Sequence, residues 1–136
     1  MDSKEIVKSF VSATNERDWE KASHFLHSTV KRNSSTYGQP TVAKKEDLIA
    51  FHKAELETFP DLVETILFMI CENDMVGARI NFKGTQLGPL GQFPPSQKTL
   101  NADFNCFFKI HNDKIVEIWV EYDILNGLIQ LGHYKP

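Results

Sequence analysis

The order in which helix and strand patterns follow one another is the feature that most constrains this chain. Apolar residues at helical spacing mark three N-terminal segments, which begin near Asp2, Trp19 and Lys44, and Pro60 ends the third. Four strand patterns follow, at residues 62–71, 76–84, 99–110 and 114–122. Helices followed by a run of strands predict the α+β fold class.

Turn signals between the strand patterns predict antiparallel pairing. The stretches "ENDM" and "HND" supply tight turns, and "GTQLGPLGQFPPSQ" forms a long connection between the middle strands. A short strand is also predicted within residues 30–35, and a final helix over 124–131 with Gly132 placed to cap it. We expect a single domain over residues 1–136, in which N-terminal helices pack on a strongly bent, mostly antiparallel sheet and leave a conical pocket.

Charge and hydropathy exclude several classes of partner. The net charge is −3 and the pI about 5.9, so we expect no nucleic acid and no anionic membrane as partner. The longest apolar run, residues 66–71, is too short to span a bilayer, and the N-terminus does not resemble a secretory leader. Cys71 and Cys106 lack metal-ligand spacing and are expected to be buried thiols in a reducing cytoplasm, with no metal site.

Alternation along the strands divides the expected sheet into two faces. One face is apolar, and the other is polar but mixed with aromatic residues. This mixed face carries Arg79, Asp103, Phe107, Trp119 and Glu121, and Asp123 continues the same parity. It is either a solvated outer surface or the wall of a cavity, and Trp119 fits a solvated surface poorly.

Asp123 stands where an apolar strand turns into an apolar helix. Two roles are open for it. In an aromatic, poorly hydrated pocket, desolvation would favour the protonated carboxyl, which suits a group that takes and returns a proton. Alternatively, Asp123 simply caps the final helix. Asp103 and Glu121 are further acid/base candidates, and each could equally be a surface charge.

Other polar residues are candidates for orienting a substrate. An inward Arg79 would polarise an enolate or hold a carboxylate, and a cross-strand salt bridge is its alternative. Arg32 and Asn33, on the short strand, are placed to reach the pocket mouth. His52 is expected on a helix surface. We find no serine–histidine–aspartate order and no phosphate-binding loop.

Several motifs together resemble the SnoaL-like polyketide cyclases of the nuclear-transport-factor-2-like superfamily. They are "FPDL" at 59–62, "GTQLGPLGQFPPSQK" at 84–98, "KIVEIW" at 114–119, and Asp123 followed by "QLG" at 130–132. The resemblance covers nearly the whole chain. It implies a cone-shaped domain, a homodimer, a small-molecule substrate, and a buried apolar pocket that works without metal or organic cofactor.

The resemblance also implies roles for individual residues. The family's acid/base aspartate, four residues after the strand tryptophan, corresponds to Asp123 after Trp119. Three polar family positions differ, because Gln86, Ile118 and Cys106 stand where histidine, histidine and aspartate are common. Gln86 therefore counts here among the substrate-binding candidates. We expect Trp119, Phe107, Phe59 and the loop at 87–93 to line the cavity, with Gly88 and Gly91 letting that loop move.

Three functions remain open at this point. The first is a cofactor-free enzyme that cyclises, isomerises or rearranges a polycyclic, carbonyl-bearing natural product in secondary metabolism through Asp123. The second is an epoxide or lactone hydrolase, which needs two carboxylates and an arginine around one water; Asp123, Asp103 and Arg79 would supply them if they converge. The third is a non-catalytic small-molecule-binding or dimerisation module.

Overall fold

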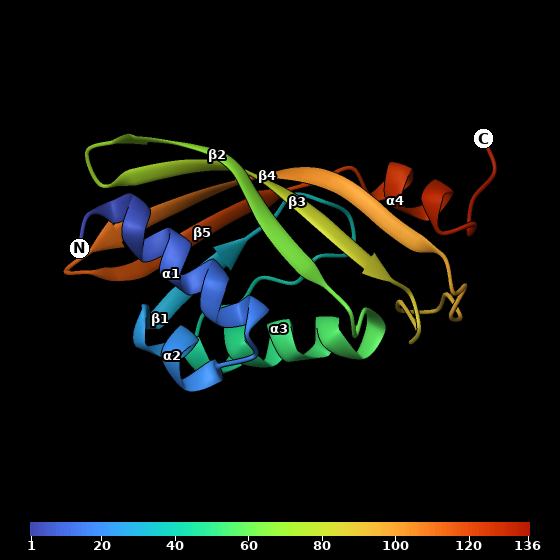
Figure 1. Cartoon of the computed structure of the whole chain (residues 1–136), viewed down its shortest axis with the longest axis horizontal. Helices are drawn as coiled ribbons and strands as arrows, with labels where there is room; N and C mark the ends of the chain where they lie inside the picture. The colour runs from blue at the N-terminus through green and yellow to red at the C-terminus, as the bar shows by residue number, and fades with distance from the viewer.

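The computed structural model describes all 136 residues of the chain. Three N-terminal helices precede and interleave with the first strand, and a short fourth helix follows the last strand (Figure 1). The helices are α1 (Ser3–Asn15), α2 (Trp19–His24), α3 (Lys45–Thr58) and α4 (Ile124–Gln130). The strands are β1 (Leu26–Asn33), β2 (Val63–Glu72), β3 (Met75–Thr85), β4 (Thr99–His111) and β5 (Lys114–Glu121). The predicted α+β fold class is confirmed.

The five strands form one sheet in the order β1-β5-β4-β3-β2. The β2–β3, β3–β4 and β4–β5 pairs are antiparallel, and only β1 pairs in parallel, with β5. Asn73 sits in the β2–β3 turn, and Asn112 and Asp113 in the β4–β5 turn; all three have positive φ, as tight hairpins require. The two predicted turns therefore set the register of the meander.

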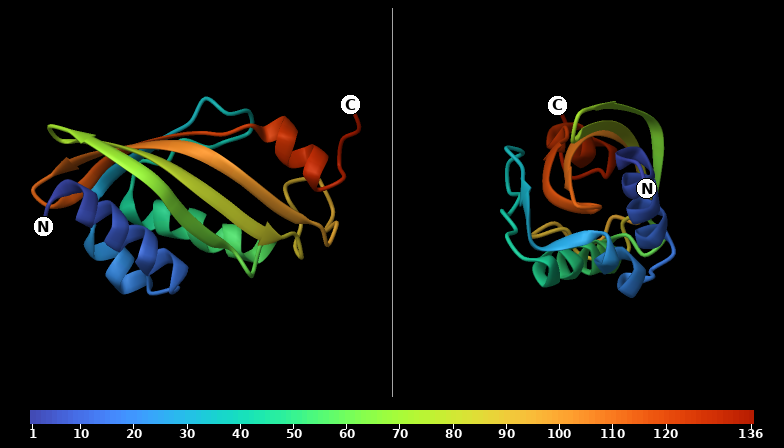
Figure 2. Two further views of the ribbon diagram at one scale, coloured as in Figure 1. Left: turned by 45° about the horizontal axis from the view of Figure 1, so that its top comes forward. Right: turned by 90° about the vertical axis from the view of Figure 1, so that its left-hand side faces the viewer.

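The sheet curls strongly, and helices α1 to α3 lie against its concave side (Figure 2). Residues of one parity in β3, β4 and β5 face those helices and form the main core with α1. Ile80, Phe108 and Ile118 of the sheet, with Ile6 and Phe10 of α1, are all at most 3% exposed. A smaller buried cluster consists of Phe59, Leu62 and Leu131. Between the two clusters the bent sheet and α3 leave space for a pocket.

Aspartate caps fix where three helices begin. Asp2 accepts a hydrogen bond from the Glu5 backbone N–H at 2.9 Å, and Asp18 accepts one from Lys21 at 3.1 Å. Asp123 does the same for α4. Each cap satisfies an N–H that the helix itself leaves free.

Two sequence expectations need correction here. The first strand starts at Leu26, earlier than predicted, because its parallel pairing with β5 extends back to Ile115. Cys71 is exposed near the end of the edge strand β2, so only Cys106 is a buried thiol.

None of the helices combines the length and apolar character needed to cross a membrane.

Candidate active site

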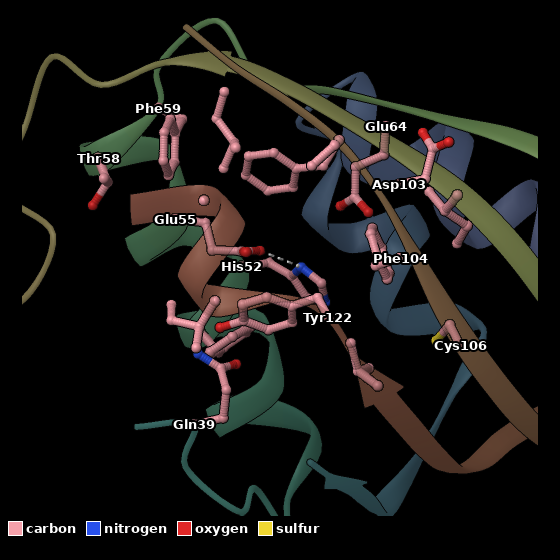
Figure 3. Close-up of a pocket in the computed structure, with 18 of the residues that line it drawn as sticks. Gln39, His52, Glu55, Thr58, Phe59, Glu64, Asp103, Phe104, Cys106 and Tyr122 are labelled. Carbon is pink, nitrogen blue, oxygen red and sulfur yellow. Dashed lines mark ion pairs between the residues drawn. The ribbon is translucent and has the colours of Figure 1, made fainter. Parts of the chain in front are cut away.

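A cavity of about 330 Å³ lies between the concave face of the sheet and helices α1, α3 and α4 (Figure 3). Nineteen of its 30 lining residues are hydrophobic, so it suits an apolar small molecule. Phe59 lines it as expected and meets Phe82 edge to face, with ring centroids 5.2 Å apart. Leu90, from the loop between β3 and β4, also borders it.

Trp119 and Phe107 do not line this cavity, so the expected placement of both is wrong. They pair across β4 and β5 on the convex face of the sheet. Phe107 is 51% exposed and lies over Gly77, where an added Cβ would come within 3.1 Å of its ring. Strand parity explains the correction, because the mixed polar face is the outer one and Ile118 and Val120 point inward instead.

Arg79 and Asp103 also belong to the convex face. Arg79 Nη2 lies 3.8 Å from Asp103 Oδ2, and its Nη1 donates to Asn105 at 3.0 Å. Asp103 stands at the edge of the cavity, but its carboxylate points away from the interior (Figure 3) and accepts from Asn81 at 2.9 Å. The cross-strand salt bridge considered for Arg79 is therefore the one observed.

Asn33, Glu121 and Gln86 make contacts outside the cavity. Asn33 donates to the Glu117 carboxylate at 2.9 Å. Glu121 is exposed and accepts hydrogen bonds from Ser35, chiefly through the hydroxyl, which lowers the pKa of its carboxyl.

Gln86 is fully buried beneath the β3–β4 loop. Its amide donates to the carbonyls of Gly88 and Pro94 at 3.1 Å each, and its carbonyl accepts from Ser96 at 3.0 Å. A Cβ on Gly88 would come within 2.1 Å of the Glu57 carbonyl oxygen. Gly88 therefore permits close packing of the loop against the end of α3.

Asp123 lies at the rim of the cavity and is exposed to solvent. Its Oδ1 accepts a hydrogen bond from the Asn126 N–H at 2.9 Å. The capping role is thus present, and the poorly hydrated surroundings expected for this carboxylate are not. Asp123, Asp103 and Arg79 do not converge inside this cavity; together with Glu121 they line a second, open and mainly polar hollow outside it.

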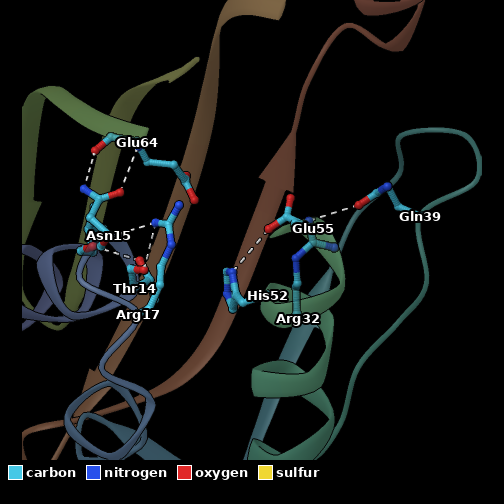
Figure 4. A network of polar contacts seen from close by, with 9 residues as sticks. Thr14, Asn15, Arg17, Arg32, Gln39, His52, Glu55 and Glu64 are labelled. Atoms are coloured by element: carbon cyan, nitrogen blue, oxygen red, sulfur yellow. Dashed lines mark hydrogen bonds and ion pairs between the residues drawn. The ribbon is translucent and has the colours of Figure 1, made fainter. Parts of the chain in front are cut away.

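The acid/base cluster of the cavity consists of His52, Glu55 and Glu64, all three half-buried. His52 Nδ1 lies 3.3 Å from Glu55 Oε1. Glu64 extends into the same space from the opposite wall (Figures 3 and 4). Burial, reinforced by the negative charge of Glu55, raises the pKa of the Glu64 carboxyl to about 7.

The local fold explains why these three side chains meet. Leu48, His52 and Glu55 follow one another at positions i, i+4 and i+7, so they share the inner face of α3. Glu64 lies two residues before Ile66 on β2 and so shares its inward-facing parity. Asn15 holds the backbone of Glu64 through hydrogen bonds of 2.8 and 3.0 Å. His52 was expected on the helix surface, which is wrong. The helical spacing from Leu48 was the signal that could have placed it inside.

Arg32 and Tyr122 add two polar groups to the cavity. Arg32 is 6% exposed, and burial lowers the pKa of its guanidinium. Burial raises the pKa of the Tyr122 hydroxyl to about 12. Cys106 also lines the cavity, where burial raises the pKa of its thiol and leaves it a poor nucleophile.

A divalent ion could bridge His52, Glu55 and Glu64, because one ligand atom from each lies within 4.8 Å of the others. One feature opposes a cation at this place, because the buried positive charge of Arg32 faces the same cavity.

Comparisons with known proteins cover almost the whole chain. The family model described as SnoaL-like polyketide cyclase matches residues 4–131. TsrD from Streptomyces laurentii is 26% identical, with a TM-score of 0.83 over 96% of this chain and 95% of its own. A protein of Jannaschia sp. CCS1, named for a SnoaL-like polyketide cyclase, is 20% identical, with a TM-score of 0.86 over 98% and 93%.

A more distant neighbour carries a different activity in its name. An LEH-like epoxide hydrolase of M. tuberculosis is 9% identical, with a TM-score of 0.76 over 95% of this chain and 88% of its own. At this identity the likeness concerns the fold alone. No curated protein matches the sequence.

Proposed function

Because the chain belongs to the SnoaL-like polyketide cyclase family, we propose that it is an enzyme that moves protons on a hydrophobic, carbonyl-bearing small molecule. The lining of the cavity is mostly apolar with a few polar groups, which suits such a molecule and supports the proposal. The reaction would be a cyclisation, isomerisation or rearrangement, since all three can pass through an enolate. The proposed proton transfer needs neither a metal nor an organic cofactor.

The observation that carries the proposal is the Glu64 carboxyl inside the cavity, with a pKa raised to about 7 by burial. A general acid/base works best when its pKa lies near the operating pH, because both protonation states are then accessible. The exposed carboxylates at Asp103, Glu121 and Asp123 lack these buried surroundings.

His52 and Glu55 complete the proposed chemistry. When His52 donates its Nδ1–H to Glu55, 3.3 Å away, the other ring nitrogen is left to accept or return a proton. Glu64 would take the proton beside the substrate carbonyl, and His52 or Glu64 would return it at another atom. The mostly apolar lining of the cavity would limit the access of bulk water to this exchange once a ligand fills it.

Asp123 remains a second candidate for the acid/base, as the family resemblance implies. It stands at the cavity rim, where a large substrate extending out of the mouth would meet it. Its fixed position at the start of α4 would hold the carboxylate without a flexible loop.

Hydrolysis of an epoxide or lactone is a second candidate function, favoured by one observation. Two carboxylates and an arginine do line one cavity, namely Glu55, Glu64 and Arg32, although not the residues expected for this role. One carboxylate would activate a water while the other groups stabilise the leaving oxygen. Incorporation of ¹⁸O from labelled water into a diol product would distinguish this function from isomerisation.

Deuterium exchange tests the leading proposal without knowledge of the natural substrate. The probe is 2-tetralone, a bicyclic ketone small enough for a cavity of about 330 Å³, in deuterated buffer at neutral pH. We expect the protein to accelerate exchange beside the carbonyl, and Glu64→Gln to reduce that acceleration by about 10²–10⁴-fold.

Asp103→Asn is the matched control, because it removes a carboxylate from the convex face without altering the cavity cluster. Equal exchange rates for Glu64→Gln and the wild type would contradict the role of Glu64. A large loss in Asp123→Asn instead would transfer the role to the rim residue.

We also propose that the chain forms a homodimer through the convex face of its sheet. That face exposes large apolar side chains, with Phe68 62%, Ile70 68% and Phe107 51% accessible. Sedimentation at micromolar concentration should give twice the 15.6 kDa chain mass, and Ile70→Glu should shift it toward the monomer. A wild-type monomer would contradict the proposal.

A further inference from the structure

Arg32 is a buried guanidinium with one donor left unused. Its Nη2 donates to Gln39 Oε1 at 3.0 Å (Figure 4), whereas Nη1 is buried and has no hydrogen-bond partner in the chain. The two ion pairs of the protein, His52–Glu55 and Arg79–Asp103, do not include it. Arg32 itself lines the cavity.

This arrangement leaves a charge unbalanced. An arginine guanidinium stays protonated in proteins, and buried charges are normally paired with an opposite charge. A buried donor without an acceptor destabilises the fold unless another group supplies one. Nη1 of Arg32 therefore lacks a hydrogen-bond acceptor in the free chain, and the cavity that Arg32 lines is the route by which an acceptor can reach it.

The surroundings hold the guanidinium in a defined orientation. Its central carbon lies 4.3 Å from the centroid of the Phe51 ring, and Gln39 fixes one of its terminal nitrogens. The backbone of Arg32 is tied to Val42 by hydrogen bonds of 2.7 and 3.1 Å. A donor fixed from three directions is preorganised to receive an oxygen at one position.

We infer that Nη1 of Arg32 binds an acidic oxygen of the ligand, so that the cavity selects a hydrophobic molecule carrying a carboxylate or an ionised enol. This inference rests on the proposed function and names its substrate class. Arg32 and Glu64 line the same cavity as the His52–Glu55 pair. A ligand anchored at Arg32 would therefore place its reacting carbon in the space that Glu64 also faces.

The charged and titratable groups around Arg32 define the competing arrangement. Glu55, Tyr122, Cys106 and Glu64 contribute to its electrostatic surroundings, with Glu55 first among them. If the Glu55 carboxylate turned from His52 to Arg32, the charge would already be balanced, and an acidic ligand would gain nothing from Arg32.

Calorimetric binding of matched probe pairs separates these arrangements. The carboxylate arm compares 2-naphthoate with neutral 2-naphthamide. The enol arm compares 2-hydroxy-1,4-naphthoquinone, which is ionised at neutral pH, with its methyl ether. We expect the wild type to bind at least one acidic member about tenfold or more tightly than its neutral partner, as a charge-assisted hydrogen bond provides.

Arg32→Gln should abolish that preference while leaving binding of the neutral probes nearly unchanged. Arg32→Lys keeps the charge without the planar fork and should retain part of it. If Arg32→Gln does not fold, the wild-type comparison still decides. Equal binding of acidic and neutral members in both arms, or a preference that survives in folded Arg32→Gln, would overturn the inference.

The test is independent of the proposed catalysis because it measures binding and not turnover. Failure of 2-tetralone exchange with a preserved acid preference would refute the role of Glu64 and leave the ligand class standing. Normal exchange with no acid preference would refute the ligand class alone.

Discussion

On the concave face of the sheet Glu64 faces an apolar cavity, while on the convex face Asp103 and Glu121 lie among solvent and polar neighbours. These are carboxyl groups on strands β2, β4 and β5 of one sheet. Burial raises the pKa of Glu64 to about 7, whereas hydrogen bonds from Ser35 lower the pKa of Glu121. The chemistry of each carboxyl is thus set by the face on which strand parity places it.

The arginines show the same contrast. Arg79, on the convex face, satisfies its guanidinium with Asp103 and Asn105 and stays partly hydrated. Arg32, on the concave face, keeps one donor without a partner. A side chain whose hydrogen-bond donors are all paired with neighbouring residues has a structural role, whereas a donor left unpaired inside a cavity indicates a ligand.

After the loss expected for Glu64→Gln, the largest expected difference between the two faces concerns catalysis through His52. His52→Gln should lower the acceleration of 2-tetralone exchange by about 10²-fold, since the group that returns the proton is lost. Asp123→Asn and Asp103→Asn should each stay within about twofold of the wild type. The measurement is the rate of deuterium incorporation by NMR. Comparable losses in His52→Gln and Asp103→Asn would erase the proposed distinction between the faces.

A second difference concerns how stability depends on pH. Glu64 holds its proton more tightly in the folded chain, where its pKa is about 7, than in the unfolded chain, where an ordinary value near 4.5 applies. Its contribution is fully present below pH 4.5 and is lost as the pH rises through about 7, by on the order of 3 kcal/mol.

Glu64→Gln should remove this loss, because an amide has no proton to release. Denaturant unfolding of both proteins from pH 4.5 to 8 measures the effect, and the difference between them cancels the other titrating groups. A wild-type stability that falls no more than that of Glu64→Gln would show that burial does not perturb this carboxyl.

A smaller effect is expected at the Asp123 cap. Asp123→Ala should destabilise the fold by about 1 kcal/mol because the Asn126 N–H loses its acceptor, while Asp123→Asn keeps an oxygen there and should be nearly neutral. Thermal unfolding checks both. A cost for Asn equal to that for Ala would show that the charge, and not the hydrogen bond, matters at this position.

The smallest effect is expected for the convex salt bridge. Replacing Arg79 by Met should change stability by less than about 1 kcal/mol, since the pair with Asp103 is partly exposed and its atoms lie 3.8 Å apart. Added salt should reduce even that difference. A destabilisation several times larger would mean that this face is covered, as in the proposed dimer.

The sequence predicted much of the fold because local patterns determine it. Turn residues such as Asn73 and Asn112, the cap at Asp2, and alternation in β3 and β4 each act over a few neighbours. The predicted start of the first strand lies several residues after its true start at Leu26. The reason is that its pairing with β5 joins segments far apart in the chain, so that no local sequence pattern marks it.

The site was harder to predict because it depends on which sheet face the helices cover. Trp119 suggested that the mixed face lined the cavity, yet the helices cover the opposite one. Glu64 lies in an apolar segment, where a carboxylate is normally expected to face solvent. Its side chain faces the cavity because Glu64 pairs with the cavity-lining Phe82 and lies opposite α3. Convergence of His52, Glu55 and Glu64 is a tertiary property.

The central claim is that Glu64 is a cavity-facing acid/base with a pKa near neutrality, and titration of the glutamate side chains tests it most directly. Carbon-13 NMR of the glutamate carboxyl groups would follow each one from pH 3 to 9 in the folded protein. We predict one resonance with a midpoint near 7 that disappears in Glu64→Gln and remains in Asp103→Asn. If every glutamate titrates in the ordinary acidic range, Glu64 is not the acid/base proposed here.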